Sequence, residues 1–397
     1  MFDVIIIGGG IVGLATGYQI LKEFPDKKLL VLEKEKDVGM HQTGHNSGVI
    51  HSGIYYKPGS LKVKNCRYGI ELLKKFCDNN DIQYEICGKL IVATRDDELP
   101  VLANLFERGK ENGIKGLMMV AEEEIKDYEP HAVGEASIFC PETGIIDYLK
   151  VCQKLSEHIN EKGEIIIGAK VSGITPKTNS ILVTTEKAEF HTRFIINCAG
   201  LFSDKVSELA GLERKLRIVP FRGEYYMLKK EARHLVKNLI YPVPDPRYPF
   251  LGVHFTRTID GEIEAGPNAV LAWAREGYAK MDINFKDMWD YLSYSGFWRM
   301  ARKYGSTGFE EYYRSFFKSA FLKSIQRLVP DIKEDQIETN PAGVRAQALD
   351  PQGLLVDDFV IKNTNNMIHV INAPSPAATS SLSIGMHINK LYSSIIN

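Results

Sequence analysis

The order of hydrophobic and polar positions predicts a strand, a turn, a helix and a second strand at the start of the chain. Residues 2–7 form a continuous, mainly β-branched run, as expected of a buried parallel strand. Glycines break this run, residues 14–23 have helical spacing, and residues 29–32 form another apolar run. This order is typical of a parallel α/β unit.

Farther along the chain, the pattern changes from α/β to mainly β and then back. Residues 215–272 alternate in the manner of antiparallel strands, and residues 286–328 have helical spacing with many aromatic side chains. Residues 368–371 form a last strand, and a helix follows from Ser381. The outer parts of the chain are therefore predicted to be α/β, and the middle to be an inserted antiparallel sheet with no visible linker.

Composition narrows the class of protein without naming a function. A chain of 397 residues suggests two or three domains. Its 49 basic and 50 acidic residues leave a net charge of −1, which argues against a nucleic-acid-binding protein. No apolar run approaches the roughly 18 residues of a membrane span, the first residues lack the basic region of a signal peptide, and the six cysteines are scattered. We therefore expect a cytoplasmic protein with reduced thiols and no metal site.

A glycine motif in the first turn predicts a dinucleotide site. Gly8, Gly10 and Gly13 follow the first strand and open the first helix, which is the context that a pyrophosphate-binding turn requires. Glu33 stands at the end of the second strand, 20 residues after Gly13, where a carboxylate can bind a ribose hydroxyl. Glycines, strand, helix and acid together predict a bound dinucleotide.

NAD and FAD both bind to this arrangement, and two later segments favour FAD. Residues 194–200 form a buried strand that ends in a turn of small residues, where backbone can approach a ligand closely. Residues 372–381 lead into the final helix, whose free N–H groups can face the electron-rich edge of a flavin. The alternative for each segment is an ordinary helix entry capped by Ser or Thr. Together with the glycine motif, however, the two segments predict FAD.

Longer motifs resemble one family of flavoenzymes. The glycine motif, residues 194–200 and the last helix are similar to those of FAD oxidoreductases of the D-amino-acid-oxidase type. Within that group the chain resembles the L-2-hydroxyglutarate dehydrogenase/oxidase family, through HNSGVIHSGIYYKPGSLK at 45–62, RGEYY at 222–226, PVPDP at 242–246, GVHFTR at 252–257, GPNA at 266–269 and GVRAQ at 343–347. The resemblance implies oxidation of L-2-hydroxyglutarate to 2-oxoglutarate by hydride transfer to the flavin, with electrons passing to a quinone or to oxygen.

The resemblance also implies a domain arrangement and a set of FAD contacts. We expect an α/β fold, α+β overall, in which a Rossmann-type FAD-binding domain (1–80, 145–210 and 335–397) is interleaved with an antiparallel-sheet substrate domain (81–144 and 211–334). The residues expected at FAD are Gly8, Gly10, Ile11, Val12, Gly13, Glu33, Lys34, Thr43, His45, Asn46, Ser47, Gly48, Val171, Ala199, Gly200, Arg345, Pro376, Ala377, Ala378, Thr379 and Ser380.

Oxidation of an alcohol also needs a base, and a histidine is the natural candidate at neutral pH. His45, His51 and His254 are candidates by position, because His51 lies in the loop after the second strand and His254 on a strand of the central sheet. We favour His51 and His254 as the catalytic pair beside the substrate. The alternative for each is a hydrogen bond to a loop carbonyl or covalent attachment to the flavin.

The substrate carries two carboxylates, so two cationic anchors are expected, preferably arginines. Arg345 is expected in a glycine-containing turn. Arg257, three residues after His254, can share a pocket with it only near a bulge or a strand end. Arg222 is a third candidate, for which an ion pair with a neighbouring acid is the better explanation. Tyr55 and Tyr226 are expected either to donate their hydroxyls to a carboxylate or simply to pack. Lys57 is expected to draw anions to the entrance of the site.

Residues 289–327 combine many aromatic side chains with seven basic residues against three acids. A helical, aromatic and basic segment is typical of interfacial membrane contact, which suits transfer of electrons to a membrane quinone and a peripheral place on the inner face of the cell membrane. A helical lid or an oligomer contact, with the aromatics in the core, explains the segment equally well.

Two other functions stay open at the level of sequence. The first is a sister flavoenzyme acting on another small acid, such as an amino-acid oxidase or a glycerol-3-phosphate dehydrogenase. The second is a flavin-binding scaffold without turnover, which is expected to have lost the polar residues of the pocket.

Overall fold

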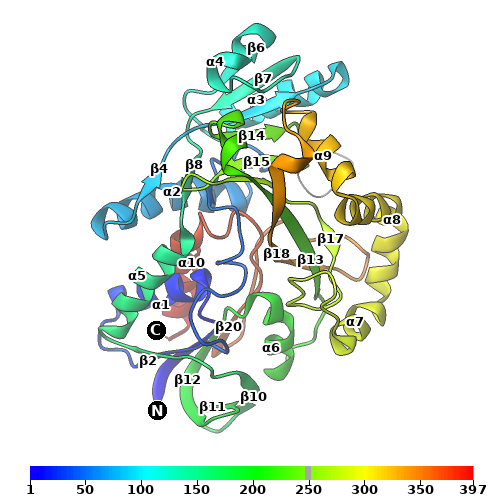
Figure 1. The fold of residues 1–397 in the computed structure, drawn as a ribbon. Helices are drawn as coiled ribbons and strands as arrows, with labels where there is room; N and C mark the ends of the chain where they lie inside the picture. The colour runs from blue at the N-terminus through cyan, green and yellow to red at the C-terminus, as the bar shows by residue number, and fades with distance from the viewer. Residues whose placement is uncertain (246–251, 397) are drawn as a thin grey trace.

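The computed structural model describes residues 1–245 and 252–396, and its elements form two large sheets and one small sheet (Figure 1). The first large sheet is mainly parallel. Its central strand β1 pairs in parallel with β2 on one side and with β12 on the other. In turn, β2 pairs in parallel with β9, and β12 with β20. The strands β10, β11 and β19 pair antiparallel with their neighbours. The strands are β1 (Phe2–Ile7), β2 (Leu29–Leu32), β9 (Glu164–Ile166), β10 (Val171–Pro176), β11 (Ile181–Thr185), β12 (Glu189–Asn197), β19 (Val360–Asn363) and β20 (Met367–Asn372).

Helices from both ends of the chain cover this parallel sheet. Val4 and Ile6 of β1 and Leu29 and Val31 of β2 are buried in the core beneath these helices. The alternate residues of both strands are buried in a second core on the opposite face of the sheet. Two of the helices have side-chain caps, since the Ser60 hydroxyl accepts from the amide of Val63 and the Asp147 carboxylate from that of Leu149. The helices are α1 (Ile11–Glu23), α2 (Leu61–Asn79), α5 (Tyr148–Asn160) and α10 (Ser381–Ile396). The predicted strand, turn, helix and strand at the N-terminus are thus confirmed.

The second large sheet is antiparallel except for one parallel pair, β5 with β14. Its longest pairing joins β13 and β18, which cross the middle of the molecule in Figure 1. The strands are β5 (Lys89–Ala93), β6 (Met118–Ala121), β7 (Ala136–Cys140), β13 (Arg217–Leu228), β14 (Leu239–Pro242), β15 (His254–Arg257), β16 (Ile263–Gly266), β17 (Val270–Leu271) and β18 (Ile337–Leu349).

The two faces of this second sheet differ in chemistry. One face is apolar and packs on α9 (Lys318–Gln326), with Leu90, Phe255 and Tyr226 among the buried residues. The opposite face is covered at one end by α3 (Leu99–Glu111), which packs on Ile91. Beyond α3 this face carries polar side chains.

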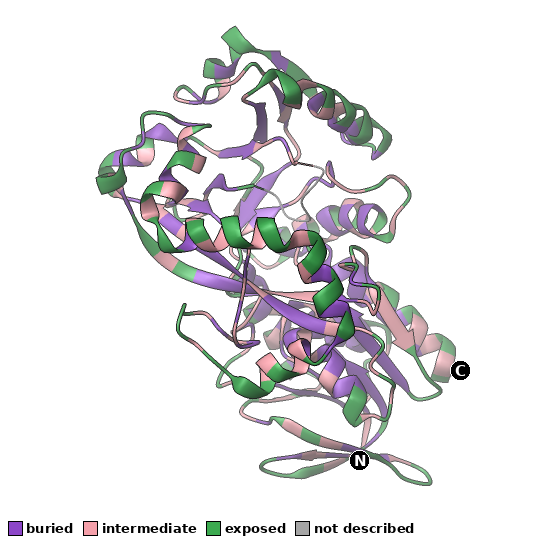
Figure 2. Ribbon diagram, turned by 90° about the vertical axis from the view of Figure 1, so that its right-hand side faces the viewer, coloured by how far each residue is buried: buried purple, intermediate pink, exposed green. Residues whose placement is uncertain are grey.

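The remaining elements connect or cover the sheets. The third sheet joins β3 (Val49–Ile50), β8 (Gly144–Ile146) and β4 (Tyr84–Glu85). The other helices are α4 (Ile125–Tyr128), α6 (Ser203–Leu209), α7 (Phe285–Leu292) and α8 (Ser295–Phe316), with 3-10 turns at Asp96–Glu98, Glu122–Glu124, Gly200–Phe202, Lys230–Leu235 and Glu334–Gln336. In Figure 2 buried residues follow the interior strands, whereas the outer helices are largely exposed. No helix in the described residues is long and apolar enough to span a membrane.

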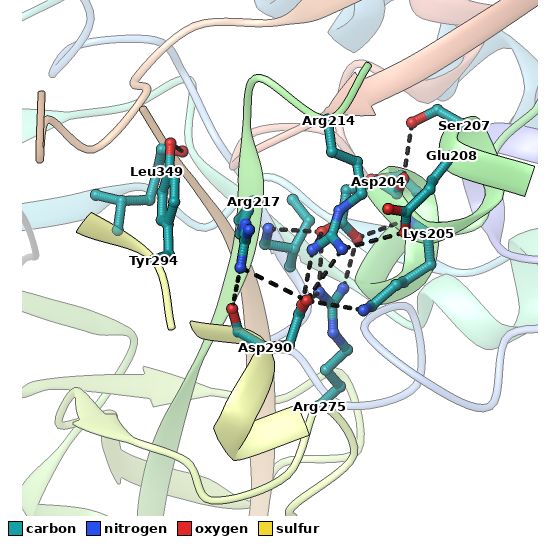
Figure 3. Close-up of polar contacts among 12 residues, drawn as sticks. Asp204, Lys205, Ser207, Glu208, Arg214, Arg217, Arg275, Asp290, Tyr294 and Leu349 are labelled. Carbon is teal, nitrogen blue, oxygen red and sulfur yellow. Dashed lines mark hydrogen bonds and ion pairs between the residues drawn. The ribbon is translucent and has the colours of Figure 1, made fainter. Parts of the chain in front are cut away.

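A buried network of charges ties α6 to α7 and to the start of β13 (Figure 3). The guanidinium of Arg275, 1% exposed, donates to both oxygens of Asp204 at 2.6 and 2.9 Å and to Asp290 at 2.8 Å. Arg214 pairs with the same two carboxylates, at 3.0 and 2.7 Å. The carboxylates belong to α6 and α7, so the network holds together segments that follow different sheets.

Three predictions about the fold need correction or stay open. Arg345 does not lie in a turn: it is on β18, opposite Phe221 of β13, because the alternation of residues 337–349 is irregular and hides the strand. The sequence pattern also predicts a hairpin of residues 181–185 with 188–191 and a separate strand at 194–197, whereas residues 189–197 form the single strand β12. The predicted α/β fold with an interleaved β sheet is confirmed, while the proposed domain boundaries stay a prediction.

Candidate active site

The glycine turn at the start of α1 is shaped by contacts that exclude larger residues. Gly8 has φ +112°, and a Cβ there would lie 2.4 Å from the carbonyl oxygen of Cys198. A Cβ on Gly13 would lie 2.0 Å from the carbonyl oxygen of Gly8. The residue before α1 is Gly10, so no side chain caps the helix at its N-terminus. The first amide of α1, that of Ile11, donates to the Thr43 hydroxyl at 3.1 Å. The N-terminus of a helix after such a glycine turn is suited to an anionic group such as a pyrophosphate.

Glu33 lies where the sequence predicts it, at the end of β2 beside the glycine turn. Its buried carboxylate accepts from the amides of Gly9 at 2.7 Å and Glu35 at 2.9 Å. A carboxylate has about four acceptor positions, so both oxygens can still accept from a hydroxyl. The two amide hydrogen bonds fix the position of the Glu33 carboxylate, and its remaining acceptor positions fit the hydroxyls of a ribose.

A second group of FAD candidates surrounds the N-terminus of α10. The Thr379 hydroxyl accepts from the amide of His51 at 3.2 Å and bonds to the Tyr148 hydroxyl at 2.8 Å, which holds the 43–51 loop against α10. The hydroxyls of Ser380 and Ser381 are buried without a hydrogen-bond partner in the described residues. Buried polar atoms without partners are costly, so these two fit a ligand that supplies acceptors or donors.

The loop that follows β2 is tied to the second sheet. A Cβ on Gly343 of β18 would lie 2.3 Å from the carbonyl oxygen of His45, and the His45 ring bonds to the carbonyl of Ala342 at 3.1 Å. The amide of Gly48 donates to the Asn46 side chain at 2.8 Å. These contacts join the loop to β18, and Thr43 of the same loop accepts from the Ile11 amide at the glycine turn.

Lys34 has a different environment from the other predicted FAD contacts. Its ammonium pairs with the carboxylates of Glu35 and Glu276, and His41 bonds to the same two carboxylates at 3.0 and 2.9 Å. The acidic partners hold the pKa of Lys34 above its usual value, despite the opposing effect of burial. Glu35, His41 and Glu276 have the donor set of a cation site, but the ammonium already supplies the positive charge.

The other predicted FAD contacts lie at ends of strands or beside them. Val171 begins β10, and the amide of Ala199 donates to the Asn197 side chain at 3.1 Å just after β12. Gly200 has φ +51°, as a close turn requires. The segment 376–378 packs its alanines on the core of the parallel sheet.

The polar face of the second sheet carries the side chains that can contact a substrate. Phe255 and Tyr226 point to the apolar core on α9, so alternation places their neighbours His254 and Tyr225 on the opposite face. Lys89 and Tyr241 join this face, and the imidazole of His254 stacks on the Tyr241 ring with centroids 3.8 Å apart. Four strands thus contribute to one polar surface.

The two predicted catalytic histidines are both neutral in this site. Enclosure by protein, aided by the positive charges of Lys89 and other cations, lowers the pKa of His51 to about 3. Burial likewise lowers the pKa of His254 to about 3, with Arg345 and Lys89 adding to the effect. The Nδ1 atom of His254 lies 2.8 Å from the carbonyl of Gly252, and a carbonyl can only accept, so Nδ1 carries the proton and Nε2 is the free base.

Arg345 projects from β18 toward the same face. Its guanidinium donates to the carbonyl of Asn268 at 3.3 Å, and its charge acts on both His254 and Tyr225. Burial lowers the pKa of the Arg345 guanidinium, yet an arginine stays charged at neutral pH. The site therefore holds a charged fork beside a neutral imidazole.

The structure does not bring every predicted substrate residue to this face. Arg257 donates to Glu85 at 2.6 Å and to Asn238 at 3.0 Å, on the side of the strand opposite to His254. Tyr226 packs against Phe321 of α9, with ring centroids 4.5 Å apart, and Lys57 is exposed in its loop. Arg222, as expected, pairs with an acid, Glu224, at 2.9 Å.

Two residues of the polar face are absent from the sequence prediction. Lys89 begins an otherwise apolar strand of five residues, and a lone lysine in such a run is the sequence signal that marks it. Tyr241 lies in a short apolar run that gives no hint of a site. Tyr55, which was predicted, contacts Lys89 with its ring.

A family model and named relatives match nearly the whole chain. A family model described as FAD dependent oxidoreductase matches residues 3–391. The L-2-hydroxyglutarate dehydrogenase of Indibacter alkaliphilus is 53% identical over 386 residues, which cover 97% of each chain. The mitochondrial L-2-hydroxyglutarate dehydrogenase of Homo sapiens is 47% identical over 401 residues, covering 96% of this chain and 87% of the human one.

Solved structures show the same fold at lower identity. Dithionite-reduced L-alpha-glycerophosphate oxidase from Mycoplasma pneumoniae, with FAD bound, superposes with a TM-score of 0.80 at 22% identity and covers 99% of this chain and 94% of its own. Glycine oxidase from Geobacillus kaustophilus gives 0.74 at 15% identity, over 99% and 95% of the two chains. The cofactor is FAD, and the chain belongs to the L-2-hydroxyglutarate dehydrogenase family of the FAD-dependent oxidoreductases.

Proposed function

We propose that this protein oxidises L-2-hydroxyglutarate to 2-oxoglutarate at the polar face of the second sheet. The observation that carries the proposal is the meeting of Arg345, His254 and His51 beside the segments that fit FAD. The identity to named L-2-hydroxyglutarate dehydrogenases supports the choice of substrate. When bound, FAD supplies the two-electron acceptor for the hydrogen at C2.

His254 is proposed as the base that takes the proton of the substrate hydroxyl. The Gly252 carbonyl fixes its tautomer and so presents the Nε2 lone pair. In the substrate-free site the nearby cations disfavour protonation of the imidazole. A bound dicarboxylate offsets those charges and raises the proton affinity of Nε2, so the base gains strength when the substrate is present.

Arg345 is proposed to hold the carboxylate next to C2. A planar guanidinium binds a carboxylate through two parallel hydrogen bonds, which fixes orientation as well as position. The carbon that loses hydrogen is directly bonded to that carboxylate, so the Arg345 fork determines how C2 faces the flavin. His51, whose Nε2 lies 3.4 Å from the Ser375 hydroxyl, lies toward the flavin end of the site.

Anaerobic reduction of the flavin tests the substrate assignment. L-2-hydroxyglutarate is expected to bleach the absorbance near about 450 nm, a general property of flavin chemistry. Amino acids and sn-glycerol 3-phosphate are expected to leave it unchanged. Bleaching by one of them, but not by L-2-hydroxyglutarate, would assign the protein to a sister activity. Full flavin occupancy without reduction by any small acid would support a scaffold.

The base is tested by comparing two asparagine variants. His254→Asn is expected to slow flavin reduction by about 10²–10⁴-fold while keeping the flavin spectrum, because Asn cannot accept the proton. His51→Asn is the matched variant and is expected to lose less. The reverse order of the two losses would make His51 the base.

We also propose that the exposed aromatic face of α7 and α8 contacts a membrane and that the electron acceptor is a quinone. Large apolar side chains stand out from this face: Trp289, Phe309 and Phe316 are 73%, 77% and 65% exposed. An exposed apolar surface that is also basic is suited to the headgroup region of an anionic bilayer. A lid or oligomer contact would instead cover these side chains.

A further inference from the structure

Lys89 is a buried lysine with no anionic partner among the residues that the structure describes. It begins β5, a central strand of the second sheet, and is 1% exposed. Within the described chain its ammonium forms no hydrogen bond and no ion pair. Burying an ammonium in this way costs several kcal/mol, and a leucine would pack here at no such cost. The stability of the fold therefore does not explain why a lysine occupies position 89.

Two aromatic rings hold the ammonium in place. Its Nζ atom lies 4.4 Å from the ring centroid of Tyr55 and 4.7 Å from that of Tyr241. Such contacts stabilise a cation, but they offset only part of the free-energy cost of burying it. The Tyr55 hydroxyl is also buried without a partner in the described residues. A cation and a hydroxyl donor are thus both left unsatisfied in one place.

Lys89 belongs to the same surface as the proposed substrate site. The Tyr241 ring that contacts its ammonium stacks on His254. The positive charge of Lys89 lowers the pKa of both His51 and His254, whereas that of Arg345 acts on His254. The imidazole of His254 therefore lies within the electrostatic reach of two cations that come from different strands, β5 and β18.

We propose that Lys89, with the Tyr55 hydroxyl, binds the C5 carboxylate of the substrate and thereby selects a dicarboxylate over a monocarboxylate. This assignment rests on the proposed function, in which Arg345 holds the carboxylate beside C2. A compact ammonium on a flexible stem suits the distal end, where only charge has to be recognised. A substrate without that carboxylate leaves the ammonium buried and unpaired.

Lys89→Met separates selectivity from catalysis. We expect kcat/KM for L-2-hydroxyglutarate to fall by about 100-fold, mainly through KM, because a buried charge pair is lost. For L-2-hydroxyvalerate, which lacks the C5 carboxylate, kcat/KM is expected to stay within about threefold of wild type or to rise. Lys62→Met is the matched control, because Lys62 is also buried but pairs with Asp357 at 2.6 Å. It is expected to leave the ratio between the two substrates unchanged.

Binding without turnover distinguishes failure of this proposal from failure of the proposed function. Binding is followed by titrating the wild-type holoenzyme and recording the oxidised flavin spectrum. The Kd for glutarate is expected to be about 100-fold lower than that for butyrate, and Lys89→Met is expected to remove this preference. Equal preference in wild type and variant would overturn the role of Lys89, even with L-2-hydroxyglutarate as substrate. The opposite result is also informative. If Lys89→Met abolishes the preference for glutarate but L-2-hydroxyglutarate does not reduce the flavin, the role of Lys89 stands and the proposed substrate is wrong.

The variant is expected to fold, because the replacement removes an uncompensated charge. Its thermal midpoint without ligand should equal or exceed that of wild type. Tyr55→Phe provides a second, milder test, since it removes only the hydroxyl. It is expected to weaken glutarate binding by about tenfold and leave butyrate unaffected, and identical loss for both acids would overturn the assigned contact.

Discussion

The chemistry of the site depends on a few side chains whose surroundings differ from water. His51 and His254 lose their affinity for protons because they are enclosed and lie near cations. Arg345 keeps its charge in the same surroundings because guanidinium is too basic to lose it. A neutral base beside a permanent cation is the combination that removal of a proton from an anionic alcohol requires.

Removal of the Arg345 fork is expected to act on substrate binding more than on the flavin. Arg345→Ala should raise KM for L-2-hydroxyglutarate by about 100-fold, because a charge-assisted, bidentate contact is lost. Arg345→Lys should recover part of that loss, since it restores charge without the fork. Steady-state kinetics and flavin content measure the two effects, and an unchanged KM in the alanine variant would exclude Arg345 from the site.

The pH dependence of kcat/KM reports the ionisation of the free enzyme. Both histidines have pKa values of about 3, so they stay in the base form at higher pH. Burial lowers the pKa of Lys89 to about 8, and this group loses its proton as pH rises above that value. We expect kcat/KM to be flat from about pH 5 to pH 7.5 and to fall above about pH 8.

The variant Lys89→Met controls for this assignment, because it should lack the alkaline fall. An acidic fall centred near pH 6.5, the ordinary value for histidine, would contradict the enclosure of the two imidazoles.

At the level of elements, β13 and β18 give the site its position. Their pairing places Arg345 opposite Phe221, and the absence of a side chain on Gly343 lets β18 approach the loop that carries His45. The charge network of Asp204, Arg275 and Asp290 then joins α6 to the segments that follow β17. Strand register and buried ions together hold the two sheets in one arrangement.

That network is expected to contribute strongly to stability. Arg275→Met leaves two buried carboxylates with fewer partners and should lower the free energy of unfolding by about 3–5 kcal/mol. Lys215→Met is the control, because Lys215 and its partner Glu213 are exposed, and it should change stability by less than about 1 kcal/mol. Urea denaturation followed by circular dichroism measures both. Equal stability of the two variants would show that the network is dispensable.

At the scale of the whole molecule, polar and apolar surfaces are unevenly distributed. The parallel sheet is covered by α1, α2, α5 and α10, while α7 and α8 present aromatic residues to solvent. The near-zero net charge of the sequence conceals the basic excess of residues 289–327. The exposed aromatic residues and the basic excess thus occur on the same side of the molecule, where α7 and α8 lie (Figure 1).

Vesicle binding tests the proposed membrane contact. Replacing Trp289, Phe309 and Phe316 with Ser should weaken sedimentation with phosphatidylglycerol vesicles by at least about tenfold, since each exposed ring contributes burial in the headgroup region. Met118 and Met119 of β6 are 43% and 44% exposed and provide the control positions. Unchanged sedimentation in the aromatic variant, or a mass that depends on protein concentration, would favour a lid or an oligomer contact.

The sequence alone determined the dinucleotide turn, the parallel α/β unit and the resemblance to one family. These features depend on local spacing: three glycines and Glu33 fix a turn and a strand end within the first 33 residues, and long motifs are read directly. Single residues such as His254 can be proposed from the sequence because their chemistry suits the reaction.

The tertiary structure decided which of those residues share a surface. Arg257 and Tyr226 point to the far face of their strands, whereas Lys89 and Tyr241 join His254. This could not be read from the chain, because one step along a strand reverses the direction of a side chain, and because β5 and β18 lie far in sequence from β14 and β15. Residue types specify what chemistry is possible, and strand register specifies where it occurs.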